Sequence, residues 1–107
     1  MAIDNNRILL EAEKLRREIN REVINPLIPV LSLEDLKPLI TMVARARARY
    51  MRELLDLAKV TSDLPPSDEQ IQRLRHQRET YEELVKAAGA LETVIEREYL
   101  DVRPTRK

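Results

Sequence analysis

Four closely spaced arginines are the residues of this sequence whose type and spacing most readily suggest chemistry. Arg45, Arg47, Arg49 and Arg52 stand in the run ARARARYMR at residues 44–52, which also holds a tyrosine. Arginines neutralise phosphates and tyrosine rings stack on bases, so the run is compatible with nucleic-acid binding. However, the chain carries 19 basic and 19 acidic residues. This zero balance disfavours a nucleic-acid partner, because nucleic-acid-binding domains usually carry a clear basic excess.

Residue types that carry catalysis or bind metals are scarce. The chain has no cysteine and one histidine, His76, so cysteine-based zinc sites and two-histidine metal sites are excluded within one chain. A single glycine argues against phosphate-binding loops. Position 73 is arginine, so the Glu-x-x-His spacing of di-iron bundles is absent. We therefore expect no catalytic residue, metal or cofactor, and a non-enzymatic protein; a small enzyme subunit is the more distant alternative.

The elements that position these residues are predicted to be helices. With no Trp or Phe, the core must come from Leu, Ile, Val, Ala and Met, and 36% of the residues are charged, which is typical of amphipathic helices. Six prolines leave three long segments with a helical apolar period. We predict one helical domain over residues 1–103, with helices at about 5–24, 33–60 and 68–101, followed by a basic, frayed tail at 104–107.

Helix starts can be assigned from capping residues. Ser32 with Asp35, and Ser67 with Gln70, have the three-residue spacing of a capping box. Pro38 falls in the first turns of the second helix, where its ring clashes one turn back. We therefore expect a bend or a short separate turn there.

Charge blocks predict how the second and third helices pair. Residues 37–52 hold five basic residues and no acid, whereas residues 79–101 hold seven acids and two basic residues. Folding the chain about residue 64 places position n opposite roughly 128 minus n, with Val43 facing Val85 and Arg45 near Glu83. The predicted fold is all-α: a three-helix bundle built on a long antiparallel hairpin and completed by self-association.

Residues 25–33, NPLIPVLSL, are poorly explained by local structure, because five apolar residues with two prolines cannot form regular helix. The segment either caps the bundle or docks a partner. Leu27, Ile28, Val30 and Leu31 are its candidate partner-binding residues.

The leading functional hypothesis is a helical protein–protein interaction module, such as an adaptor, assembly factor or regulator, acting through an apolar helical surface. The expected partner is a second copy or another helical protein. The alternative is a nucleic-acid-associated protein that uses the arginine-rich face. No apolar segment is long enough to cross a membrane, and a cytoplasmic location is expected.

Overall fold

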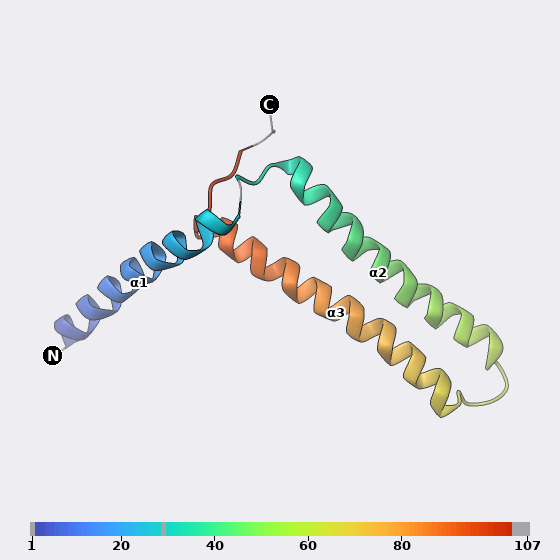
Figure 1. Ribbon diagram of the computed structural model, residues 1–107. Coiled ribbons are helices and arrows are strands. Elements are labelled where there is room, and N and C mark those ends of the chain that lie inside the picture. Colours follow the sequence, from blue (N-terminus) through green and yellow to red (C-terminus); the bar gives the residue numbers. More distant parts are fainter. Residues whose placement is uncertain (1, 29, 104–107) are drawn as a thin grey trace. The chain divides into compact units, whose positions relative to one another are not determined.

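The computed structural model describes residues 2–28 and 30–103, and its regular elements are all helical (Figure 1). They are α1 (Ala2–Ile24), the short 3-10 helix η1 (Asn25–Leu27), α2 (Leu33–Val60) and α3 (Asp68–Glu96). The chain divides into two compact units, Met1–Leu36 with Ala90–Lys107, and Lys37–Gly89. The predicted all-α class built on a hairpin is confirmed. The predicted tail at 104–107 lies outside the described residues.

Helices α2 and α3 form the antiparallel hairpin (Figure 1), and the less exposed positions on each recur at alternating spacings of three and four residues, typical of a coiled-coil seam. On α2 the positions of this series are Leu36, Leu39, Val43, Ala46, Tyr50, Glu53 and Leu57, and on α3 they are Gln70, Leu74, Gln77, Tyr81, Leu84, Ala88 and Leu91; a few other residues, such as Thr41 and Gly89, are equally shielded but fall outside the series. Pairing Leu39 with Ala88 aligns the whole series down to Leu57 with Gln70. This alignment lies one residue from the predicted register.

Contacts across the hairpin support that register. The Arg47 Nε donates a hydrogen bond of 3.0 Å to the Tyr81 hydroxyl, and the rings of Tyr50 and Tyr81 lie 6.1 Å apart. Nearer the loop, Arg73 and Glu53 form an ion pair of 3.8 Å. Four residues that the predicted register places in the interface, each opposite an apolar residue of the other helix, instead lie beside the seam and are exposed: Ile40, Leu54, Ile71 and Val85.

Both predicted capping pairs make contact, and the pair at Ser67 and Gln70 forms the full reciprocal capping box. The Asp35 carboxylate accepts hydrogen bonds from the Ser32 backbone N–H at 2.9 Å and from its hydroxyl at 3.1 Å. At the start of α3, the Gln70 side chain accepts from the Ser67 N–H at 2.8 Å, and the Gln70 N–H donates to the Ser67 hydroxyl at 3.2 Å. The predicted separate turn is absent, because α2 runs continuously from Leu33 through Pro38.

The third helix ends five residues before the predicted end at Asp101. Glu98 has a φ of 60°. The Glu98 N–H donates to the Ile95 carbonyl at 3.1 Å and the Tyr99 N–H to the Val94 carbonyl at 3.0 Å. This is the Schellman pattern, in which a residue in the left-handed region stops the helix, here a glutamate instead of the usual glycine. Sequence pattern alone favoured continuation, since glutamate is a good helix former.

After this turn the chain pairs with the segment before α2. The Leu31 N–H donates to the Asp101 carbonyl at 3.0 Å, and the Arg103 N–H donates to the Leu31 carbonyl at 2.8 Å, which makes an isolated parallel bridge between Leu31 and Val102. Ser32, Tyr99 and Leu100 are buried here. These residues are the core of the unit that holds α1.

Within residues 2–28 and 30–103, no helix is both long and apolar enough to cross a membrane.

Candidate functional site

The helix α1 carries an exposed apolar stripe along one face, which we define as Ile8, Ala12, Leu15, Ile19 and Val23. The four large side chains of the stripe are between 49% and 69% exposed. Every residue from Asp4 to Ile19 is exposed. No described part of the unit that holds α1, which also includes the turn after α3, covers these residues.

The C-terminal end of α1 is held by side-chain contacts. Arg21 donates a hydrogen bond of 2.8 Å to the Glu98 carbonyl and forms an ion pair with Asp101. Just beyond the helix, the Asn25 side-chain oxygen accepts from the Asp101 N–H at 3.1 Å. These contacts fasten the end of α1 to the turn after α3 and leave the stripe uncovered.

The turn that receives α1 also holds Arg97. The Arg97 guanidinium donates a hydrogen bond to the side chain of Tyr99, and this bond is the main factor that raises the pKa of Arg97 above its ordinary value.

The four candidate residues between α1 and α2 are divided by the structure. Leu27 is 77% exposed and Val30 is also exposed, whereas Ile28 and Leu31 are half-buried. Leu31 is fixed through both of its backbone groups to residues 101–103. The segment therefore packs down on one side and presents Leu27 on the other, which combines features of the predicted cap and of the predicted docking segment.

The arginine-rich face of α2 is only partly available. Arg47 is bound to Tyr81, and Arg52 pairs with Asp56 at 3.2 Å. Arg45 and Arg49 are exposed, and among the described residues no ion pair joins them to Glu83 and Glu79, the acids that the register predicts nearby. Two of the four arginines are thus free to meet a ligand.

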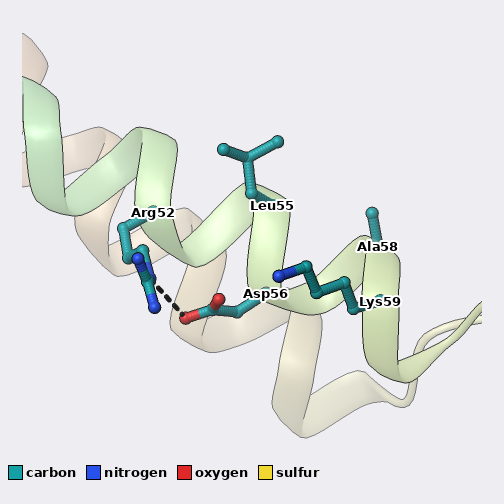
Figure 2. Close-up of a pocket in the computed structure, with 5 residues that line it drawn as sticks. All are labelled: Arg52, Leu55, Asp56, Ala58 and Lys59. Carbon is teal, nitrogen blue, oxygen red and sulfur yellow. Dashed lines mark hydrogen bonds and ion pairs between the residues drawn. The ribbon is translucent and has the colours of Figure 1, made fainter.

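The hollow next to Arg52 is not a binding site for a small ligand. Figure 2 shows its lining residues, Arg52, Leu55, Asp56, Ala58 and Lys59, all from α2. The Arg52 and Asp56 side chains point toward each other, and Leu55 points away from them. A space lined by successive turns of one helix has no opposing wall, so it cannot enclose a small ligand.

Metal binding finds no support in the part of the chain that the structure describes. No group of three or more His, Asp or Glu side chains there is placed to hold an ion. The single histidine, His76, is exposed, and its carbonyl accepts a hydrogen bond of 3.0 Å from the Thr80 hydroxyl.

Sequence reasoning identified the α1 stripe as the apolar face of the first helix. Helical periodicity shows that a face is apolar; it does not show whether the chain itself covers that face. No local signal in α1 could have separated the two cases.

Comparison of the chain with protein-family models, with curated proteins and with solved structures found no match.

Proposed function

We propose that this protein is a helical protein–protein interaction module whose working surface is the α1 stripe. The observation that supports the proposal is the exposure of Ile8, Leu15, Ile19 and Val23 along one face of a 23-residue helix. Burying a large aliphatic side chain completely contributes about 1.5–3 kcal/mol. Burying the exposed half of each of these side chains would therefore contribute on the order of 1 kcal/mol. A partner that covers the stripe would recover that free energy.

The stability of α1 itself supports the same function. Isolated helices are marginal in water unless an apolar face is packed. Contacts at Arg21 and Asn25 hold one end of α1, but residues 4–19 have no cover. We infer that a partner helix both binds the stripe and stabilises α1 as a helix.

The test replaces one stripe residue and one matched residue outside the stripe. Leu15→Asp places a charge in the stripe, whereas Leu10→Asp makes the same change at a 73% exposed position outside it. Leu15→Asp should abolish association, measured as molar mass in solution, and leave the free energy of unfolding of the monomer within about 0.5 kcal/mol of wild type. Leu10→Asp should change neither. A loss of about 2–4 kcal/mol of monomer stability on Leu15→Asp would show that the stripe is core, and would contradict the proposal.

A second candidate function rests on Arg45 and Arg49, which are exposed and lack the predicted ion pairs. Two free guanidinium groups at i and i+4 could contact phosphates of a nucleic acid. Retention on a nucleic-acid column at low salt, lost in Arg45→Ala with Arg49→Ala, would support it. Retention that is unaffected by the substitutions would count against this face.

A further inference from the structure

We propose that the partner of the α1 stripe is α1 of a second copy of this chain, paired in parallel as a short coiled coil. The inference rests on the proposed function and names the occupant of its surface. It is argued from the spacing of the stripe, from the charges beside it and from the ion pairs that α1 forms in the structure.

The first four residues of the α1 stripe have the spacing of a coiled-coil seam. Ile8, Ala12, Leu15 and Ile19 follow one another at four, three and four residues, which are the d, a, d and a positions of a heptad repeat. They span about 16 Å at 1.5 Å per residue. Since all four are exposed, the seam is free to pair along its whole length.

Charges beside the seam favour a second copy in parallel. In a parallel pair, a g position of one helix meets the e position five residues later on its partner. Here the g position Glu11 would meet Arg16 of the second copy, and the two-fold symmetry repeats this attraction. In an antiparallel pair g positions face each other, and the g positions of α1 are Asp4, Glu11 and Glu18, so carboxylates would repel.

The ion pairs within α1 leave Glu11 available. Arg16 pairs with Glu13 on its own helix, with both side chains 54% exposed. Among the described residues Glu11 has no ion pair. An exposed pair such as Arg16–Glu13 is weak. Arg16 can therefore reach a partner carboxylate at little cost, and Glu11 gains a partner that its own chain does not provide.

A charge-swap series tests the pairing. The dissociation constant of the dimer is measured by light scattering or sedimentation at low salt, where the wild type should have a mass near twice 12.5 kDa. Glu11→Arg alone and Arg16→Glu alone should each weaken the dimer by about tenfold, because each replaces an attraction by a repulsion. Both substitutions in one chain should restore the affinity. Arg17→Glu, outside the seam, is the control and should leave the affinity unchanged.

Cysteine cross-linking tests the alignment independently, because the chain has no cysteine of its own. In the parallel pair Ala12 meets Ala12 of the second copy, so Ala12→Cys should form a disulfide-linked dimer on mild oxidation. Arg17→Cys, on the outer side, should not. In the antiparallel alignment position 12 meets Leu15, and Ala12→Cys would remain monomeric in denaturing gels.

The outcomes separate this inference from the function on which it rests. A wild-type dimer that is strengthened by Glu11→Arg, or whose double swap shows no rescue, would overturn the parallel pairing while leaving the stripe as the interaction surface. A wild-type monomer whose stripe variants stay folded would also overturn it. Destabilisation of the monomer by Leu15→Asp would instead defeat the proposed function itself.

Discussion

The Arg47 guanidinium lies over the ring of Tyr81, with its central carbon 5.3 Å from the ring centroid and its Nε 3.0 Å from the hydroxyl. The interaction joins the two helices of the hairpin, and it couples a cation–π contact with a hydrogen bond. It also explains why an arginine beside the seam is not simply a solvated charge.

Removing this contact should weaken the hairpin. Arg47→Ala should lower the free energy of unfolding by about 1–2 kcal/mol, and Tyr81→Phe, which keeps the ring, by about half as much. Urea denaturation followed by circular dichroism measures both. Arg45→Ala on the same helix is the control. If Arg45→Ala lowers the free energy of unfolding as much as Arg47→Ala does, the contact between Arg47 and Tyr81 does not stabilise the hairpin specifically.

The helix stop at Glu98 predicts a stabilising substitution. A residue with a side chain at a φ of 60° is less favourable than glycine in the same conformation. Glu98→Gly should therefore raise the free energy of unfolding by about 1 kcal/mol. Thermal or chemical unfolding measures this change in stability. Glu98→Ala is the control and should not raise the free energy of unfolding. A loss of stability in Glu98→Gly would indicate that the Glu98 side chain is needed.

Gly89 predicts a second stabilising change. In α3 a Cβ placed on this glycine meets no atom within 4 Å other than its chain neighbours and the backbone of its own helix, so a methyl group fits there. Gly89→Ala should raise stability by about 0.5–1 kcal/mol. The reverse change at a nearby exposed position, Ala87→Gly, should lower stability by a similar amount. Differential scanning calorimetry measures both, and a lower melting temperature for Gly89→Ala would argue that the glycine is required.

The segment between α1 and α2 predicts a separation of folding from association. Leu27→Asp with Ile28→Asp should keep the helix content, because Leu27 is exposed and Ile28 is only half-buried. If the segment docks a partner, which is one of the two alternatives that the sequence leaves open, association should be lost, and a measurement of molar mass in solution would show it. Leu100→Ala is the comparison. Because Leu100 is buried, this substitution should lower the free energy of unfolding by about 2–4 kcal/mol. Unfolding of the Leu27 and Ile28 variant would identify the segment as core.

Sequence reasoning was most successful where two independent patterns constrained the same element. The apolar period and the charge blocks gave the hairpin register to within one residue, and the Arg47–Tyr81 contact confirms it. Both capping boxes were predicted because their side chains act on backbone groups only three residues away. Such local chemistry is encoded completely in neighbouring residues.

The parts that failed depend on contacts distant in sequence or on conformations that a residue type does not favour. The end of α3 depends on the left-handed conformation of Glu98, which glutamate rarely adopts. Periodicity also cannot report what lies against Ile8 and Leu15 of α1, because it shows only that the face is apolar. The sequence therefore identified the residues of the candidate surface, but it could not show that they are exposed.

The bridge between Leu31 and Val102 also sets an order of events during synthesis. The hairpin of α2 and α3 is made of neighbouring segments, so it can form as soon as both helices have left the ribosome. The hydrogen bonds of Leu31 to Asp101 and Arg103 cannot form until those residues, which are made after both hairpin helices, are available. The unit that holds α1 therefore closes after the hairpin, although α1 is made before it, and the α1 stripe leaves the ribosome before that unit has closed.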